Sequence, residues 1–353
     1  MYTRNLKEAP ENLIKEGKAS FGSFSKPPKT LNIKGMKYPF GVLPLPTFIT
    51  NLRIRSNLSF TFSTSEYFGT IDLLDSKIYG FSEINIWNKK TLQRYSYKNV
   101  MVLIRRLIPK NLEKAICSTY SKNRYVRISW DEAKNRFSIV FNLKGDNIRP
   151  NFMGSFVSSF ASESSSLTSV LPAPVMRRCF ASYQKSMVVE GGICITRGKM
   201  NPFFFPQKTQ SLFVMTRAYY KSRTLNNLIT GIGKVGDDEI TFRISDMSIF
   251  PLDKDTYNEN VLFVNNEITP LPPVTVTHPY GKMKKWVIQD TESMIDLVFT
   301  PDSASQRVIS VVLLHAQFFT VFGTFNGVLI TREGKSITLK DFPGIIKNQR
   351  IRL

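Results

Sequence analysis

The glycine-rich segment at residues 231–236 has the residue types and spacing of a nucleotide-binding loop. Its sequence, Gly-Ile-Gly-Lys-Val-Gly, matches the G-x-G-x-x-G fingerprint. That fingerprint holds a pyrophosphate only where a helix begins directly after it, because the N-terminus of the helix faces the phosphates. Here Asp237, Asp238 and Glu239 follow, and then the alternating segment 240–244. We therefore expect these glycines to close a β-hairpin, and we predict no cofactor.

The two histidines, His278 and His315, are the next residues whose chemistry could matter. Neither has a second His, Cys or carboxylate at the spacing of a metal site. The Gly-x-Ser-x-Gly elbow of a serine hydrolase does not occur in the sequence. We expect both histidines to be structural or exposed, and we predict no metal site.

Glu259 is the carboxylate with the most unusual neighbours. It follows Tyr257 and stands between Asn258 and Asn260. A buried glutamate among amides can act as a hydrogen-bonding anchor or as a general acid. Glu259 is the single catalytic candidate that we name, and the anchoring role is the alternative. We expect a protein without catalytic activity.

The segment 83–136 is strongly basic. It holds thirteen Lys and Arg residues against four Asp and Glu, with Trp and Tyr residues between them. Cations that contact phosphates and rings that stack on bases form the binding faces of proteins for single-stranded nucleic acid. The alternative is the solvated exterior of a barrel whose rings turn towards the core. The candidate residues for polyanion binding are Lys89, Lys90, Arg94, Arg105, Arg106, Arg124 and Arg127.

The composition of the chain limits the class of protein to which it can belong. The 353 residues exceed one typical domain, and 42% are hydrophobic, which excludes a disordered chain. The net charge of +21 predicts attraction to nucleic acid, anionic lipid or acidic partners, or serves solubility alone. Cys117, Cys179 and Cys194 form no CxxC pair, which favours a reducing compartment. The N-terminus resembles no secretory signal, and no apolar run could span a membrane. We expect a cytoplasmic protein and leave its oligomeric state open.

Alternation of apolar and polar residues with period two dominates the chain, as at 60–63, 193–196, 240–244 and 337–339. Turn residues separate these segments, for example at 144–147, 190–192 and 333–335. Many short strands joined by hairpins predict antiparallel sheets that close as barrels or stack. The segment 111–120 could form one short helix.

The chain divides into three parts. Five prolines and three glycines between residues 22 and 46 exclude a regular element there. We predict an extended Pro-rich lead-in over 1–50, a first β-barrel over 51–170 and a second over 171–353. The serine-rich segment that begins at residue 155 and leads to Pro172 and Pro174 indicates the boundary between the barrels.

Several motifs together resemble one protein family. They are Gly22-Ser-Phe-Ser-Lys-Pro-Pro28, Leu43-Pro-Leu-Pro46, Tyr257-Asn-Glu-Asn260 with Leu271-Pro-Pro-Val274, Trp286, Phe322-Gly-Thr-Phe-Asn-Gly327 and Leu339-Lys-Asp-Phe-Pro-Gly344. Along nearly its whole length the chain resembles the family known as domain of unknown function 2804. The resemblance implies paired lipocalin-like barrels. Similar barrels occur in carotenoid hydratases and tocopherol cyclases, which act on long apolar isoprenoids.

The chain departs from this family at one motif. Similar members carry an acidic residue or pair and then Tyr-Tyr-Pro-Tyr-Arg-Thr-x-Trp-x-Trp-Ala-Thr-Gly. This sequence keeps Tyr219, Tyr220, Arg223, Thr224, Thr230 and Gly231. Val214 and Met215 replace the acid, and Asn226 and Leu228 replace the two tryptophans. Ligand binding could survive this loss, whereas acid catalysis at that position could not.

These observations predict an all-β protein of two packed lipocalin-like antiparallel barrels. Its expected function is non-catalytic binding of an apolar or amphipathic small molecule, lipid or isoprenoid-like, inside a barrel. The alternatives are binding of nucleic acid or an anionic surface through residues 89–136, and an enzyme acting on an isoprenoid-like substrate. The predicted ligand-binding residues are Tyr219, Tyr220, Arg223, Thr224, Tyr257 and Glu259. Arg223 would pair with an anionic head group.

Overall fold

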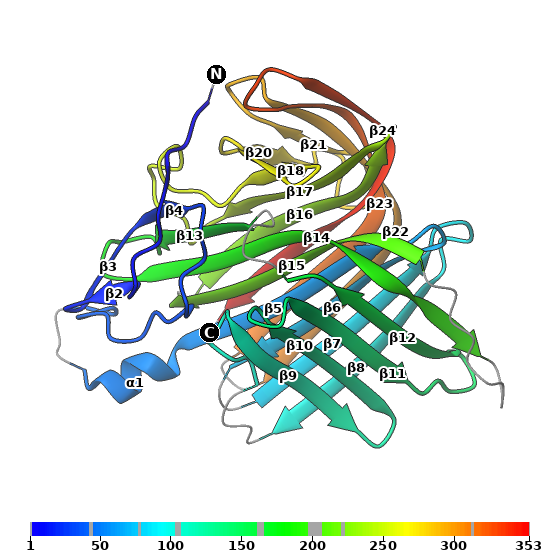
Figure 1. Cartoon of the computed structure of the whole chain (residues 1–353), viewed down its shortest axis with the longest axis horizontal. Coiled ribbons are helices and arrows are strands. Elements are labelled where there is room, and N and C mark those ends of the chain that lie inside the picture. Colours follow the sequence, from blue (N-terminus) through cyan, green and yellow to red (C-terminus); the bar gives the residue numbers. More distant parts are fainter. Residues whose placement is uncertain are drawn as a thin grey trace.

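The computed structural model describes residues 2–41, 45–76, 79–102, 107–160, 166–196, 207–219, 223–311 and 314–352. Nearly all its regular elements are strands, which form a 13-stranded sheet, a 9-stranded sheet and a small sheet of two strands (Figure 1). The first sheet is a nearly closed barrel and the second is a half-barrel, and the two pack together. The predicted all-β fold of two packed barrels is confirmed.

The first sheet follows the order β8-β7-β6-β5-β15-β14-β12-β11-β10-β9, and its two end strands approach each other. Neighbouring strands along this path are antiparallel. Its strands are β5 (Ile54–Ser63), β6 (Tyr67–Asp75), β7 (Tyr79–Asn88), β8 (Arg94–Val102), β9 (Lys114–Ser121), β10 (Arg124–Asp131), β11 (Arg136–Leu143), β12 (Asn151–Ser158), β14 (Cys179–Thr196) and β15 (Gln207–Tyr219).

Phenylalanine rings fill the interior of this barrel. The centroid of Phe62 lies 5.1 Å from that of Phe156 and 5.9 Å from that of Phe60. Phe137 lies 5.9 Å from Phe60 and 5.4 Å from Phe213. These five rings come from four different strands, β5, β11, β12 and β15, and are all fully buried. Period-two alternation therefore turns one face of each strand inward, and the inward residues form one packed aromatic core.

The second sheet follows the order β19-β18-β17-β16-β24-β23-β22-β21-β20 and is antiparallel between all neighbours. Its strands are β16 (Arg223–Val235), β17 (Asp238–Met247), β18 (Val261–Val264), β19 (Glu267–Pro270), β20 (Thr275–Thr277), β21 (Trp286–Gln289), β22 (Ile295–Val311), β23 (Leu314–Ile330) and β24 (Ser336–Arg352). It has a separate core that includes Phe242, Phe299 and Phe325.

A third apolar layer joins the two sheets. Trp87 of β7 stacks on Phe322 of β23 with ring centroids 5.7 Å apart, and Phe68 of β6 lies 5.4 Å from Phe322. Leu212 of β15 and Ile232 of β16 belong to the same cluster. Full burial of such side chains contributes about 1.5–3 kcal/mol each, so this layer holds the sheets together.

The N-terminal part wraps around the sheets and holds short elements: β1 (Leu6–Lys7), β2 (Ile14–Lys15), β3 (Lys18–Ala19), β4 (Gly22–Phe24) and the helix α1 (Thr47–Leu52). Strands β1 and β4 pair with each other, and β4 pairs with β13 (Ser166–Pro172), which in turn pairs with β14. The proline-rich lead-in is therefore attached to the first sheet by hydrogen bonds.

The predicted helix at 111–120 is wrong. Residues 114–121 form strand β9, which pairs along its whole length with β10. Within β9 the side chains of Cys117 and Thr119 are buried and their neighbours are exposed. The inward period-two face and the ladder to β10 outweigh the local helix propensity of Leu112 to Ala115.

The chain changes from the first sheet to the second between Tyr219 and Arg223, because β14 and β15 complete the first sheet. This change lies later in the sequence than the predicted domain boundary at residue 170, which stays a prediction. The glycine-rich segment closes a hairpin, as expected: Gly236, with a φ of 60°, lies in the turn between β16 and β17. Within the described residues, no helix has the length and apolar character needed to cross a membrane.

Candidate functional site

A cavity of about 540 Å³ lies between the two sheets. Its first wall is the outer face of the first barrel, and its second wall belongs to the second sheet. The apolar side chains in these walls come from Leu74, Phe81, Val100, Phe180, Leu212, Val214, Leu228, Met247 and Phe318. The charged side chains come from Arg55, Asp72, Glu83, Arg243, Arg307 and Lys347. The volume is within the range of about 300–1,000 Å³ that is usual for small-molecule sites.

Strand alternation places these residues. In β5, Phe60 points into the barrel core, whereas Ser59 and Thr61 line the cavity. In β15, Phe213 belongs to the barrel core, and Leu212 and Val214 on either side line the cavity. The same strands therefore build the aromatic core on one face and one cavity wall on the other.

An ion pair crosses the cavity between the sheets. Nζ of Lys347 on β24 donates to both carboxylate oxygens of Asp72 on β6, at 2.7 Å each. Oγ of Ser59 donates to Oδ1 of Asp72 at 2.7 Å. Lys347 is 12% and Asp72 is 31% exposed, so the pair is partly shielded from water.

A second ion pair forms another part of the wall. Nη1 of Arg307 on β22 lies 2.8 Å from Oε2 of Glu83 on β7. The guanidinium lies between the rings of Phe81 and Phe318, 4.3 and 4.4 Å from their centroids. Since a guanidinium stacked on rings keeps its charge with little hydration, this arrangement fixes Arg307 at the interface.

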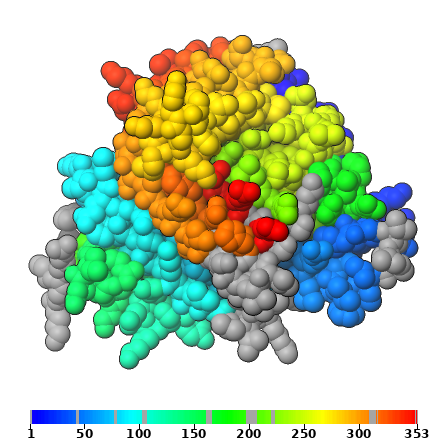
Figure 2. Space-filling view, turned by 180° about the vertical axis from the view of Figure 1, so that it is seen from behind, coloured from blue at the N-terminus to red at the C-terminus, as the bar shows by residue number. Residues whose placement is uncertain are grey.

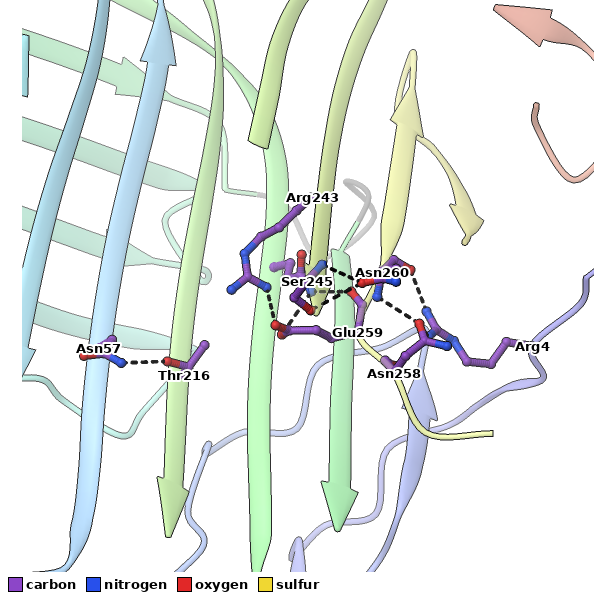
Figure 3. Close-up of polar contacts among 9 residues, drawn as sticks. Arg4, Asn57, Thr216, Arg243, Ser245, Asn258, Glu259 and Asn260 are labelled. Atoms are coloured by element: carbon purple, nitrogen blue, oxygen red, sulfur yellow. Dashed lines mark hydrogen bonds and ion pairs between the residues drawn. The ribbon is translucent and has the colours of Figure 1, made fainter. Parts of the chain in front are cut away.

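The third carboxylate is Glu259, which lies behind the cavity wall. Its Oε1 is 2.8 Å from Nη1 of Arg243, whose side chain does line the cavity (Figure 3). Nε2 of Gln184, on β14 of the first sheet, donates to the backbone carbonyl of Glu259 at 2.8 Å. Glu259 has no exposed surface. It is therefore joined to both sheets, and Arg243 separates it from the cavity.

The two asparagines beside Glu259 complete a clamp. Oδ1 of Asn260 accepts hydrogen bonds from the backbone N–H and the hydroxyl of Ser245, at 2.8 and 3.3 Å, and its Nδ2 donates to Pro272 O at 2.8 Å. Nη2 of Arg4 donates to Asn260 O at 2.9 Å, and Nη1 donates to Asn258 O at 2.6 Å (Figure 3). Burial lowers the pKa of Arg4. The Tyr-Asn-Glu-Asn block thus ties the N-terminus, β14, β17 and residues 271–272 together.

One amide in the cavity wall has an unused acceptor. Asn226 of β16 is 1% exposed, and its Oδ1 has no hydrogen-bond partner among the described residues. Its neighbour Asn227 has a partner, because Nδ2 of Asn348 donates to its Oδ1 at 2.7 Å. A buried, unpaired acceptor costs about 1–3 kcal/mol, so Asn226 is the wall residue best suited to accept a hydrogen bond from a ligand.

The predicted ligand-binding residues lie in different environments in the structure. Tyr219 is buried in the first barrel, where its hydroxyl donates to Ile33 O at 3.0 Å and burial raises its pKa. Arg223 is exposed, Thr224 is buried, and Tyr257 is half-buried against Phe21. Tyr220 lies outside the described residues. None of the five that are described lines the cavity, so their role in ligand binding stays a prediction.

The predicted polyanion-binding residues are also in unlike environments. Nζ of Lys89 donates to Ser63 Oγ at 2.9 Å, and burial lowers the pKa of Lys89 to about 8. Burial also lowers the pKa of the half-buried Arg94. Lys90 and Arg127 are exposed, and Arg124 is half-buried. Arg105 and Arg106 lie outside the described residues. The polyanion-binding role stays a prediction.

The histidines have the expected surroundings. The ring of His278 packs on Trp286 at 4.4 Å, and His315 is exposed and contacts Gln317. The part of the chain that the structure describes contains no group of three or more His, Cys, Asp or Glu residues that could hold a metal ion.

Sequence reasoning missed the residues that line the cavity. Asp72, Arg243, Arg307 and Lys347 are spread over nearly the whole chain and belong to no motif. The available signal was the charge on single outward positions of otherwise apolar strands, such as Lys347 after Ile345 and Ile346. That signal also marks an ordinary solvated face, so it cannot identify a site alone.

Comparison with known proteins establishes the family. The chain belongs to the family described as Domain of unknown function (DUF2804), whose model matches residues 4–353. No curated protein matches the chain significantly. Among solved structures, the chain is similar to kievitone hydratase from Nectria haematococca, with 11% identity and a TM-score of 0.43. The match covers 84% of this chain and 88% of the hydratase.

Proposed function

We propose that this member of the DUF2804 family binds an apolar or amphipathic small molecule, such as a lipid or an isoprenoid-like compound, in the cavity between its sheets. The observation that carries the proposal is the composition of the cavity walls. Leucine, valine, methionine and phenylalanine side chains form most of the lining, and a few charged and amide groups lie among them. Sites for small molecules have this combination of a large apolar surface with few polar groups.

The place of the ligand differs from the barrel interior that the sequence suggested. Phe60, Phe62, Phe137, Phe156 and Phe213 pack against one another inside the first barrel. An apolar chain there would displace aromatic contacts worth about 0.5–1.5 kcal/mol per pair. The cavity between the sheets needs no such displacement.

The polar groups of the cavity suit an amphipathic ligand with a polar head. Lys347 and Arg243 present cationic atoms, and Asn226 presents an acceptor that has no partner among the described residues. An anionic head would compete with Asp72 for Lys347, whereas a head with an N–H or O–H would donate to Asn226. The apolar part would lie along Leu212, Val214 and Leu228.

Non-catalytic binding fits the carboxylates better than proton transfer does. Asp72 is paired with Lys347, Glu83 with Arg307 and Glu259 with Arg243. Each of these three carboxylates is held by a cationic side chain at 2.7–2.8 Å and does not stand free towards the cavity. The enzyme alternative rests on Glu259, and Arg243 stands between Glu259 and the cavity.

The test is to fill the cavity. Leu228 lines it on β16, and Leu228→Trp should occupy the apolar volume. Native mass spectrometry of the full chain, purified at high salt, would record any retained molecule. Titration with a dansyl-labelled fatty acid would then measure affinity, and we expect Leu228→Trp to weaken it at least about tenfold, as expected for loss of one buried apolar contact surface.

Leu225→Trp is the matched control, because Leu225 lies on the same strand and is 47% exposed. This variant should bind the probe as the unaltered protein does. Equal binding by the Leu228→Trp variant would contradict the proposed place of the ligand. If the unaltered protein neither retains a small molecule nor binds the probe, the binding proposal itself is wrong.

A further inference from the structure

Helix α1 presents its apolar side chains to solvent. Phe48 is 67%, Leu52 is 54% and Ile49 is 38% exposed, whereas Thr50 is the buried residue of the helix. Residues 48 and 52 are one helical turn apart and lie on the same face. A short surface helix normally has the opposite arrangement, with its apolar face on the core. Figure 1 shows α1 at the lower left edge of the molecule, where it leads into β5.

More apolar side chains are exposed close to this helix. Leu45, just before α1, is 46% exposed. In the loop before β14, Met176 is 58% and Val175 is 37% exposed. Phe40 connects the two segments, because the guanidinium of Arg53 lies 4.3 Å and that of Arg178 5.8 Å from its ring centroid. We call this surface the α1 patch; its apolar members are Leu45, Phe48, Ile49, Leu52, Val175 and Met176.

Arginines lie beside the apolar residues of the α1 patch. Arg53 directly follows α1, and Arg177 and Arg178 directly follow Met176. Arg53 and Arg177 are exposed. Burial, and then the nearby charges of Arg177 and Arg53, lower the pKa of Arg178. The segments 17–65 and 164–189, which hold all of these residues, contain no Asp or Glu. The patch therefore combines exposed apolar and cationic side chains and receives no acidic residue from its own segments.

We propose that the α1 patch docks this protein on an anionic phospholipid bilayer. Aromatic and aliphatic side chains enter the boundary between head groups and acyl chains, and arginines beside them contact anionic head groups. The net charge of +21 adds long-range attraction to the same surface. A second copy of the chain is a poorer occupant, since docking like patches would bring six arginines together without a carboxylate from these segments.

The α1 patch is adjacent in sequence to residues that line the cavity. Arg55 lines the cavity and stands three residues after Leu52. Phe180, also in the lining, follows Arg178 by two residues. The docking surface thus leads into β5 and β14, two of the strands whose residues line the cavity. In Figure 2 the mid-blue surface that includes α1 lies at the lower right of the molecule.

Vesicle flotation with the full chain tests the docking. Vesicles of phosphatidylcholine alone would be compared with vesicles that also contain phosphatidylserine. We expect the protein to float with the anionic vesicles and the double variant Phe48→Ser/Leu52→Ser to lose at least about tenfold in partitioning. Replacing Arg53 and Arg177 by Gln should reduce binding by about fivefold for each charge. All four side chains are exposed, so the variants should fold normally.

Matched controls come from the outer face of β11 and β12. Val140 and Val157 are 40% and 43% exposed, and Val140→Ser/Val157→Ser should leave flotation unchanged. Lys144→Gln/Lys340→Gln, at two exposed lysines outside residues 89–136, is the equivalent charge control. Equal flotation of the Phe48→Ser/Leu52→Ser variant and the unaltered protein would overturn the proposal, as would no flotation with anionic vesicles at low salt. A dimer in sedimentation velocity that this variant abolishes, without vesicle binding, would instead identify a second copy as the occupant. None of these measurements depends on a ligand in the cavity.

Discussion

Nη1 of Arg243 lies 2.8 Å from Oε1 of Glu259, and the two side chains are 7% and 0% exposed. Arg243 comes from the second sheet. The backbone carbonyl of Glu259 accepts a hydrogen bond from Gln184 of the first sheet. The pair therefore forms both the back of the cavity wall and a joint between the sheets. A single charge left there would have little access to water, which makes the two residues dependent on each other.

Glu259→Gln should destabilise the fold by about 3–5 kcal/mol, because it leaves the Arg243 guanidinium buried without its counter-charge. Arg243→Met should have a similar effect, because it leaves the Glu259 carboxylate buried without its counter-charge. The double variant Glu259→Leu/Arg243→Met should recover much of the loss, since no unpaired charge remains. Urea denaturation measures all three. Glu8→Gln is the control, because Glu8 pairs with Lys26 in full solvent at 80% and 75% exposure. Additive single effects would show that the pair is not coupled.

Asp72→Asn should strengthen the binding of an anionic amphiphile. Lys347 now donates to both oxygens of Asp72, and removal of that negative charge leaves its ammonium available to a carboxylate head. We expect up to about a tenfold gain in affinity for a dansyl-labelled fatty acid, as for one charge-assisted hydrogen bond. Asp131→Asn, which affects the pair with Lys114 on the barrel exterior, should leave this affinity unchanged. Weaker binding by the Asp72→Asn variant would mean that the head group lies elsewhere.

Asn226→Leu should leave the free energy of unfolding unchanged or raise it by about 1 kcal/mol, because it removes a buried acceptor without a partner among the described residues. The same variant should bind a dansyl-labelled fatty amide more weakly, while its methyl ester binds as before. Asn227→Leu is the matched control on the same strand. Its Oδ1 accepts a hydrogen bond from Asn348, so this change should be destabilising. A clear loss of stability in the Asn226→Leu variant would contradict the unpaired state of that amide.

Lys89 should make stability rise with pH above about 8. Burial lowers its pKa from 10.5 to about 8, so the folded chain releases a proton that the unfolded chain keeps until about pH 10.5. Between these values the unfolded state binds more protons, and the free energy of unfolding increases with pH. Cys117 acts in the opposite sense above pH 9, because burial raises its pKa to about 12. The quantity to measure is therefore the difference in the free energy of unfolding between the unaltered protein and the Lys89→Met variant.

That difference should grow by about 1–2 kcal/mol in favour of the unaltered protein between about pH 7 and about pH 9.5. Urea denaturation at both pH values provides the measurement. Lys90→Met removes a lysine from the same turn at an exposed position and controls for the change in net charge. A difference that does not vary with pH would show that Lys89 is hydrated in the folded state.

Local pattern predicted much of the architecture. Period-two alternation at 240–244 and 337–339 corresponds to β17 and β24, and the glycine-rich segment before Asp237 closes the hairpin that its flanking residues required. The failure at 111–120 has a physical cause. Ten residues with helix-forming side chains are too few to form a stable helix alone, and pairing with β10 supplied a full ladder of hydrogen bonds.

The sequence by itself determined the all-β class, the hairpins and the aromatic content of the cores, because these depend on neighbours within a few positions. The cavity was decided by tertiary structure alone. Its charged residues extend from Arg55 to Lys347 and come together only when the outer face of one barrel packs on the other sheet. The role of Glu259 as a joint, rather than an acid, likewise depends on Arg243 and Gln184, which no spacing in the sequence connects to it.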